Sequence, residues 1–542
     1  MKPHLWSILI LLVISFIGIK ALFRSGWYTS HDGEHQLVRQ YIFDRAIKAG
    51  HIPPRIDRQL LNGLGYPLFT FTYQLPFILG EPFRLLGLSV QDTVKIVFIL
   101  TYIASGLAMY LFAQELWGKL PGFFSALLYL WAPYRFSVLF VRASLGEHVA
   151  LVFVPLLLWS LNRKFLTPTR LVVGALSFAG LVLSHVMAAQ IFLPLIVLFC
   201  LAKLFTSSKR KFLTHTVLVF TFGIGLSSYY LLPAVVHRSA IQGLNRHFYT
   251  DHFVSLKQLL YSPWGYGFSQ LGTANDDMSF QIGLAQWLVV AVATGLWLWK
   301  ARLNQASSLL AGFVLSVLMM LRLSTPIWNY LILYQHWFII DIPWRWGALA
   351  TFTAAALGGF VLSQLTGRKK FILLVLVASL AVYGNRNHLR VNEYLSYPDE
   401  RLARYDGTST SYDEYQSALA KESMVKGPDL KPIELLSGQA DIQVTQSLPH
   451  KLIFRARVDA ATQLQINTVY FPGWALLVNR QSQSIQSLLA EGVPRLKLEP
   501  GTYTIDLTYR QTPVMRLGNA ISLLTAGLIL LFMIKPKPYA QT

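Results

Sequence analysis

Long apolar runs constrain the fold of this chain more than any other feature of its sequence. A run of roughly 17–25 apolar residues is long enough to cross a bilayer as one helix. The clear candidates are residues 5–23, 93–115, 213–233, 280–300, 346–365 and 516–535. Further candidates are the fair runs 306–322 and 369–384 and the short, charge-bounded runs 120–134 and 147–162. A chain with this pattern is predicted to be a polytopic α-helical membrane protein.

One further run, residues 171–205, is too long for a single span. The stretch "SHVMAAQ" (184–190) interrupts it, which predicts two short spans at about 171–185 and 188–205. The prediction is therefore about twelve spans, within a range of eleven to thirteen. We expect the first run to be retained rather than cleaved as a signal peptide. It is longer than a typical signal core of roughly 7–15 residues, and "ALFRSGW" is a poor cleavage site.

The composition agrees with contact to lipid. Only 13% of the residues are charged and 54% are hydrophobic, with a mean hydropathy of +0.44, whereas about a quarter of the residues in a soluble domain are charged. The single cysteine, Cys200, lies in an apolar run. One cysteine provides neither a disulfide framework nor a cysteine metal site, so we expect it to be a small buried hydrophobe.

The net charge of +21 follows from topology rather than from nucleic-acid binding. With twelve spans and a cytoplasmic N-terminus, the short cytoplasmic segments hold sixteen basic residues and a single acid, Glu115. The sixteen are Lys2, Lys119, Arg163, Lys164, Arg170, Lys203, Lys209, Arg210, Lys211, Lys300, Arg302, Arg368, Lys369, Lys370, Lys535 and Lys537. Because the positive-inside bias acts through short loops, we expect both termini in the cytoplasm and all other acids outside.

The polar segments then form an exterior half. The first exterior loop, 24–92, contains a predicted surface helix at 34–48, with apolar residues at helical spacing and Gly50 at its end. Residues 386–515 form a span-free exterior segment, and 516–542 the last span and tail. Within that segment, 495–511 alternates polar and apolar residues, which predicts a half-buried strand. We expect an exterior β-sandwich over about 430–511, attached to a transmembrane domain of residues 1–385.

The stretch "HDGEH" (31–35), where the chain leaves its first apolar run, has three interpretations. It matches the H-x-x-E-H zinc-protease pattern, although Gly33 inside it does not suit a metal-binding helix. Alternatively, Asp32 caps the following helix, and His31 and His35 are ordinary interfacial residues. In the third interpretation, Asp32, helped by Glu34, is a general base at an exterior active site.

Ionisable residues also gather in three other exterior segments. "APYRFSVLFVRASLGEHVA" (132–150), "LSH" (183–185) and "DIPWRW" (341–346) contribute Arg135, Arg142, Glu147, His148, His185 and Arg345. Such groups at membrane depth are costly and usually functional. The alternatives are that the loop charges pair with each other and that the Trp and Arg residues only anchor the interface. Arginine also binds phosphate well, through its planar fork of donors.

Together these segments resemble a known family. "SHDGEHQLVRQYIFDRAIKAGHIPPRIDRQLLNGLGYPLFTFTYQLPF", "APYRFSVLFVRASLGEH", "LSH" and "IPWRW" are similar to the bacterial membrane family described as 6-pyruvoyl-tetrahydropterin synthase-related. That family is related to YfhO-like proteins and belongs to the GT-C glycosyltransferase superfamily. "YFPGWALLVN" and "LEPGTYTIDLTYRQTPVMRLGNAISLL" resemble the YfhO-type C-terminal module and closing span. The resemblance implies no pterin chemistry.

The resemblance implies a GT-C-like fold and a glycosyltransferase in the bacterial inner membrane. Such enzymes take a sugar from a polyprenyl phosphate and act on the exterior face, with a catalytic acid in the first exterior loop. Asp32 matches that position, and Glu34 is its neighbour. Arg142, Arg345 and then Arg135 are the candidates for binding the donor phosphate. His31, Glu147, His148 and His185 are further site candidates.

The partners implied are the lipid-linked donor, the bilayer and an exterior glycan, lipid or protein acceptor. A divalent cation such as Mg or Mn is possible near Asp32, Glu34 and Glu147, but no metal site is assigned. Two other classes of function remain open. One is a transporter or flippase of lipid-linked saccharide, against which the middles of the spans are nearly free of charged residues. The other is a non-catalytic scaffold whose β-module binds glycan.

Overall fold

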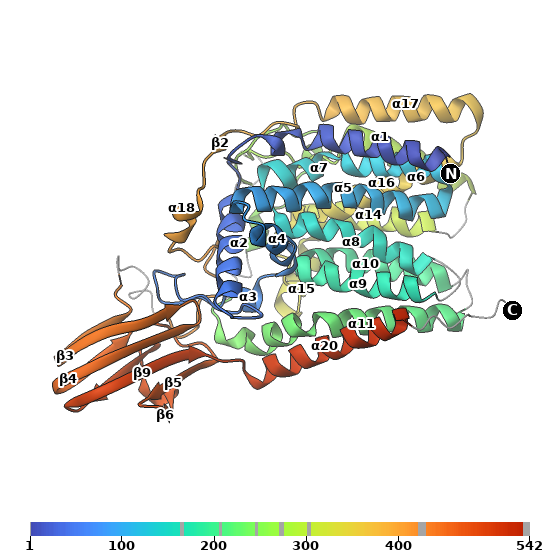
Figure 1. Cartoon of the computed structure of the whole chain (residues 1–542). Coiled ribbons are helices and arrows are strands. Elements are labelled where there is room, and N and C mark those ends of the chain that lie inside the picture. Colours follow the sequence, from blue (N-terminus) through green and yellow to red (C-terminus); the bar gives the residue numbers. More distant parts are fainter. Residues whose placement is uncertain are drawn as a thin grey trace.

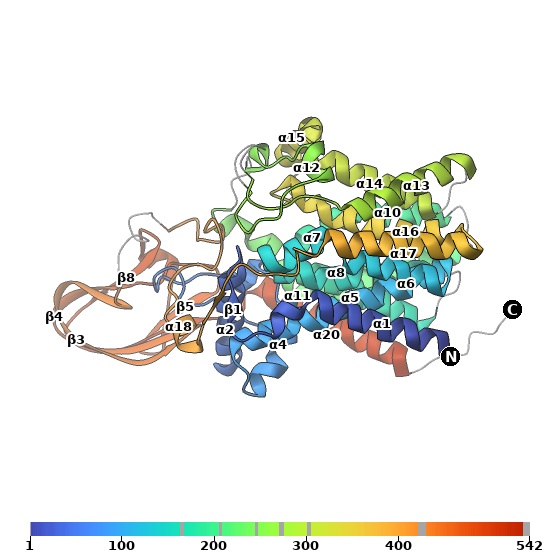
Figure 2. The ribbon, with the colours of Figure 1, turned by 90° about the horizontal axis from the view of Figure 1, so that it is seen from above.

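The computed structural model describes residues 2–162, 167–204, 209–243, 248–269, 276–300, 305–335, 337–420 and 430–534. It contains a bundle of helices that run along a common direction, with a β-sheet attached at one end (Figure 1). Helix α1 begins and helix α20 ends at the opposite end of the bundle, and the perpendicular view in Figure 2 shows the same arrangement. The molecule therefore has one end made of helix termini and short connections and another end that carries all the larger loops.

Each predicted span corresponds to an apolar helix. These helices are α1 (Lys2–Gly18), α5 (Val90–Trp117), α6 (Lys119–Leu130), α8 (Leu145–Asn162), α9 (Pro168–Ser184), α10 (Val186–Leu204), α11 (Lys209–Val236), α13 (Leu284–Lys300), α14 (Gln305–Met320), α16 (Gly347–Ser363), α17 (Gly367–Gly384) and α20 (Pro513–Ile534). Among the described residues, six helices are long and apolar enough to cross a membrane, and a bent pair would make a seventh. Four shorter apolar helices add to these. The helical membrane-type fold is therefore confirmed, while the number of spans stays a prediction.

Two interruptions of these helices position residues at the loop end. Helix α9 ends at Ser184 and α10 begins at Val186, so His185 lies at the predicted break. Helix α6 is followed by α7 (Pro133–Phe136) and a π-helical turn η2 (Ser137–Val141), and the two parts are bent by 49°. Proline suits the first turn of a helix, where the missing N–H has no partner to lose, so Pro133 can start a new helical direction there.

The loop end is covered by short elements. Helix α2 (Gly33–Lys48), the predicted surface helix, runs across the ends of the bundle helices (Figure 1). Its apolar side is fully buried, with Leu37 and Val38 each 0% exposed. The other short elements are η1 (Lys20–Phe23), α3 (Leu68–Phe71), α4 (Leu75–Leu85), η3 (His237–Ala240), η4 (Phe248–Asp251), α12 (Leu256–Leu260), η5 (Arg322–Ser324), α15 (Thr325–Tyr334), η6 (Pro343–Trp346) and α18 (Asp399–Ala403). A two-stranded sheet pairs β1 (Trp27–Tyr28), which follows η1, with β2 (Tyr394–Leu395), which follows α17.

The C-terminal module is one curved sheet, so the predicted β-sandwich is wrong. Its strands are β3 (Ile433–Leu448), β4 (Lys451–Ile466), β5 (Trp474–Val478), β6 (Gln481–Gln483), β7 (Leu489–Ala490), β8 (Val493–Leu498) and β9 (Gly501–Tyr509), with the short turn η7 (Ile485–Leu488). Strand β4 pairs with β3 along one edge and with both β9 and β8 along the other. The buried side of the sheet packs on Ile56 and Met515. Residues of the membrane domain therefore supply the contacts that a second sheet would have made.

The predicted alternation over 495–511 is present, but it is divided between two strands, β8 and β9. Leu498 pairs with Thr462, and Gly501 pairs with Val458 on the same edge of β4. Strands β8 and β9 are therefore two parts of one bent strand, interrupted by a short irregularity. Ile505, Leu507 and Tyr509 are buried as the period of two requires.

Candidate functional site

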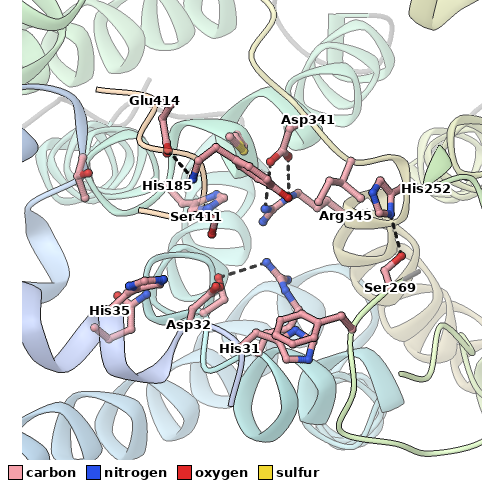
Figure 3. Close-up of a pocket in the computed structure, with 18 of the residues that line it drawn as sticks. His31, Asp32, His35, His185, His252, Ser269, Asp341, Arg345, Ser411 and Glu414 are labelled. Carbon is pink, nitrogen blue, oxygen red and sulfur yellow. Dashed lines mark hydrogen bonds and ion pairs between the residues drawn. The ribbon is translucent and has the colours of Figure 1, made fainter. Parts of the chain in front are cut away.

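Several of the predicted site residues line a cavity of about 420 Å³ at the loop end of the bundle. Residues from seven parts of the chain line it: some of 31–39, 72–73, some of 142–144, some of 185–187, 252 with 268–269 and 278, some of 341–345, and some of 411–415. Figure 3 shows ten of these side chains labelled, arranged around the opening. A second cavity, of about 410 Å³, is lined by parts of 260–264, 281–286 and 380–388 and by none of the predicted site residues.

Asp32 lines the cavity from the N-terminal end of α2. It occupies the N-cap position, and its carbonyl accepts the first helical hydrogen bond from Gln36. However, its side chain makes no capping hydrogen bond, so the interpretation of Asp32 as a cap is wrong. The backbone N–H groups of His31 and Asp32 donate to the carbonyls of Val141 and Arg142, at 3.0 and 2.9 Å. These two bonds place Asp32 beside Arg142.

Arg142 follows the π-helical turn and lines the same cavity. Its guanidinium donates to the Glu147 carboxylate at 2.6 Å and lies 4.8 Å from the ring centre of Trp344. Burial alone would lower the pKa of Arg142, but Glu147, with Tyr134 and Asp32, raises it. The guanidinium therefore stays charged. The next residue, Ala143, has φ +50, a left-handed conformation that costs roughly 1–2 kcal/mol for a residue with a Cβ.

Arg345 reaches the cavity from η6. Its Nε lies 2.8 Å from a carboxylate oxygen of Asp341, four residues earlier, and its Nη1 lies 4.0 Å from Glu147. Glu147 is thus shared by two arginines, and it also accepts the Tyr134 hydroxyl at 2.6 Å. Donors fixed in this way need little rearrangement when an anion binds.

The histidines of the cavity are neutral near pH 7. His31 donates to the carbonyl of Gly267 at 2.9 Å and stacks on Phe268. Burial lowers the pKa of His31, and burial lowers the pKa values of His35 and His185 to about 4. The Nδ1 atom of His185 accepts the N–H of Ala188, so its proton is on Nε2. The charge of the site therefore comes from its carboxylates and arginines.

Several predicted residues do not line the cavity. The Glu34 carboxylate points away and pairs at 3.5 Å with Arg401, with both side chains about half exposed. Arg135 is fully buried between the rings of Tyr102 and Tyr129 and donates to Ser105. These positions do not match the roles expected for Glu34 as a second acid and for Arg135 as a phosphate ligand.

Two further candidates lie behind the cavity rather than in its wall. Glu147 is 2% exposed and forms ion pairs with Arg142 and Arg345. His148, the next residue, is completely buried and its Nε2 lies 3.2 Å from the carbonyl of Phe98. Adjacent helical positions point in directions about 100° apart, so only one of the pair reaches the arginines.

No metal centre is apparent among the described residues, where no group of three or more His, Cys, Asp or Glu side chains could hold an ion. The H-x-x-E-H interpretation fails in the same region, because Glu34 pairs with Arg401 instead of facing His31 and His35. The described residues around Asp32, Glu34 and Glu147, where the sequence allowed a divalent cation without assigning a metal site, include no such group of three ligands.

The structure adds cavity residues that the sequence did not predict. Asp341 is the first residue of the stretch DIPWRW, and its charge, opposite to that of Arg345 four residues later, was the available signal for the pair. Arg39, Tyr412 and Glu414 also line the cavity. The last two come from a segment about 380 residues after Asp32, and no local pattern marked them.

These features define a class, namely helical membrane proteins with a charged cavity at one end of the bundle. Residues 69–388, more than half of the chain, match the model of the "6-pyruvoyl-tetrahydropterin synthase related domain; membrane protein" family. The chain belongs to that family. An uncharacterized protein of Lactococcus lactis subsp. cremoris is 25% identical over 239 residues, which are 42% of this chain and 38% of the relative. The chain thus matches well under two thirds of that relative's length.

Three solved structures are similar in fold. Arabinofuranosyltransferase AftD from Mycobacteria has a TM-score of 0.48 at 13% identity, over 72% of this chain and 27% of the other. The oligosaccharyltransferase of Archaeoglobus fulgidus has a TM-score of 0.47 at 13% identity, over 74% and 56%. ArnT from Cupriavidus metallidurans, bound to undecaprenyl phosphate, has a TM-score of 0.37 at 15% identity, over 69% and 63%. The chain spans less than two thirds of each of these proteins.

Proposed function

We propose that this protein is a membrane glycosyltransferase that moves a sugar from a polyprenyl phosphate to a hydroxyl-bearing acceptor. One observation carries the proposal: a carboxylate, Asp32, and two guanidinium groups, Arg142 and Arg345, line the same cavity. A base and a pair of phosphate-binding cations are what the transfer of a sugar away from a phosphate requires.

The reaction can be written with these groups. The acceptor oxygen attacks the anomeric carbon of the donor sugar while the bond from that carbon to the phosphate oxygen breaks. Asp32 takes the proton from the attacking hydroxyl. The electron pair of the broken bond stays on the departing polyprenyl phosphate, whose negative charge Arg142 and Arg345 balance. Atoms and charges are conserved, and no other reactant is needed.

The surrounding acids hold the arginines for this role. Asp341 and Glu147 fix Arg345 and Arg142 before the donor arrives. A bidentate guanidinium suits a phosphate better than a lysine would. A divalent cation stays a prediction of the GT-C resemblance, and the reaction above does not use one.

The rival functions predict other arrangements. A scaffold needs no base and no buried cations in a common cavity, and the position of Asp32 beside Arg142 favours an enzyme over a scaffold. A transporter would be recognised by movement of the lipid-linked sugar across the bilayer without any release of polyprenyl phosphate. An assay of polyprenyl phosphate release therefore distinguishes a transferase from a transporter or a scaffold.

The test uses the purified full chain and a panel of undecaprenyl-phosphate-linked sugars, with release of undecaprenyl phosphate as the readout. Asp32→Asn keeps the size of the side chain and removes the base, so release should fall by roughly 10²–10⁴-fold. Glu34→Gln is the matched control on the same helix, and it should keep its activity because Glu34 does not line the cavity. Full activity in Asp32→Asn, or no release by wild type from any donor, would refute the proposal.

A further inference from the structure

The segments that line the cavity differ in chemistry. The segments around 185–187, 278 and 341–345 contribute the apolar side chains Met187, Met278 and Ile342, and the last of them also contributes Arg345. The second half of the lining is defined here as the residues from α2, 72–73 and 411–415. Among the described residues of this second half that line the cavity, none is Leu, Ile, Val or Met. A polyprenyl chain suits the first set of segments, and the second half suits a ligand of another kind.

The second half is built around one segment, residues 405–415, which we term the strap. Ser411, Tyr412, Glu414 and Tyr415 of the strap line the cavity. In Figure 3, Ser411 and Glu414 lie on the opposite side of the view from Ser269 and His252. The strap therefore forms the wall of the cavity opposite Ser269 and His252.

The strap is held rigidly by elements on both sides of it. Arg39 of α2 donates to the carbonyl of Ser409 at 3.1 Å, and the Tyr66 hydroxyl is 2.8 Å from the Thr410 hydroxyl. From the other side, the N–H of Gly243 donates to the carbonyl of Glu414 at 2.9 Å. Ser409 and Asp413 both adopt left-handed φ angles, of +55 and +51. A wall fixed in this way loses little freedom when a ligand binds, which favours affinity.

The side chains of this wall suit a sugar. Tyr412 is 54% exposed and offers a ring face, and Tyr73 offers a second ring within the same half. The amide of Gln36, the hydroxyl of Ser411 and the carboxyl of Glu414 line the cavity as well. These groups can donate to or accept from several hydroxyl groups at once. Saccharides present C–H faces to stack on rings and hydroxyls at their edges, so the wall matches them on both counts.

We propose that the strap half of the cavity is an acceptor subsite and that the acceptor is a saccharide. This inference rests on the proposed transferase function, because it assigns the second substrate of that reaction. The acceptor hydroxyl would then approach Asp32 from the strap side, while the lipid phosphate lies against the arginines. Tyr412 is a specificity-determining residue in this arrangement.

The test is saccharide binding by the full chain on a glycan array, with a peptide array beside it. Wild type should bind at least one glycan class, and Tyr412→Ala should weaken that binding by roughly tenfold or more through loss of the stacking ring. Tyr412→Phe should retain most of the binding. The matched control is Tyr330→Ala, on α15, because Tyr330 is 56% exposed and does not line the cavity.

Folding and donor binding are followed separately, by the rise in melting temperature that undecaprenyl phosphate causes in each variant. If that rise is absent in wild type, the proposed transferase function fails, whatever the arrays show. If wild type binds only peptides or no glycan, or if Tyr412→Ala and Tyr330→Ala bind glycan equally, the saccharide subsite is overturned while the transferase proposal stands.

Discussion

Glu147 offers a sharp test of the arginine pair because both arginines depend on its charge. In Glu147→Gln the side chain keeps its size and can still accept the Tyr134 hydroxyl. Arg142, whose side chain is only 3% exposed, loses a carboxylate at 2.6 Å. Removal of one partner from a buried ion pair costs about 3–5 kcal/mol. We expect a loss near the lower end, about 3 kcal/mol, because Asp32 also favours the charged form of Arg142.

A lipid phosphate bound in the cavity would replace the missing negative charge. Undecaprenyl phosphate should therefore stabilise Glu147→Gln more than it stabilises the wild-type protein, even though the variant is less stable alone. Each tenfold gain in affinity adds about 1.4 kcal/mol to the stabilisation at a saturating ligand concentration. The assay is the apparent melting temperature in detergent at one scan rate, measured with and without undecaprenyl phosphate.

The matched control is Glu115→Gln at the other end of the bundle. Glu115 pairs with Arg170, so this substitution also breaks a largely buried ion pair. It should lower the melting temperature, but the shift caused by undecaprenyl phosphate should equal that of wild type. If the ligand shifts the Glu147→Gln and Glu115→Gln variants by the same amount, Arg142 and Arg345 do not form the phosphate site.

Three further predictions concern pH, the β-module and topology. Burial lowers the pKa of His185 from 6.5 to about 4, so between these values the unfolded chain binds a proton that the native state does not. The free energy of unfolding should therefore fall by up to about 3 kcal/mol as the pH drops from 6.5 to about 4. If the melting temperature of a His185→Gln variant depends on pH in the same way as that of wild type, this prediction is contradicted. Tyr509→Asp buries an unpaired charge in the sheet and should lower the free energy of unfolding by a few kcal/mol. Tyr503→Asp should lower it less, because Tyr503 is only half-buried. Equal melting temperatures of the two full-length variants would count against the burial pattern. In a background without native cysteine, Ser482→Cys on β6 should react with an impermeant maleimide in spheroplasts, whereas Thr366→Cys between α16 and α17 should react only after permeabilisation; the reverse pattern would overturn the orientation.

The helices of the bundle could be predicted because their signal is local. An apolar run of sufficient length specifies a helix wherever its neighbours lie, and even the break at His185 was visible in the sequence. The module illustrates the limit of such a signal. Alternation over 495–511 identified the strand and its buried side, but alternation does not say what covers that side. Ile56 of the first exterior loop and Met515 at the start of α20 pack against it.

The cavity could be predicted only where its residues belong to short motifs at chain interruptions. Asp32, Arg142 and Arg345 each follow or precede an apolar run, so sequence alone placed them at one end of the bundle. The same argument also selected Arg135, which belongs to the same motif as Arg142. Which of them faces the cavity depends on the π-helical turn between them, and that turn sets the side-chain direction without any sequence signature of its own.

The positions of the charges connect the topology to the chemistry. The cavity acids Asp32, Asp341 and Glu414 lie at the loop end, while the basic residues at the start of α6 and α17 lie at the other end, with the origin of α1 (Figure 1). If the basic end is cytoplasmic, as the positive-inside bias requires, the cavity opens outside the cell membrane. Nucleotide-activated sugars are made in the cytoplasm, so a transferase that works at the exterior end must receive its sugar on a carrier that crosses the bilayer. A lipid phosphate is such a carrier, and a cavity that combines aliphatic side chains with two arginines has the chemistry to bind one.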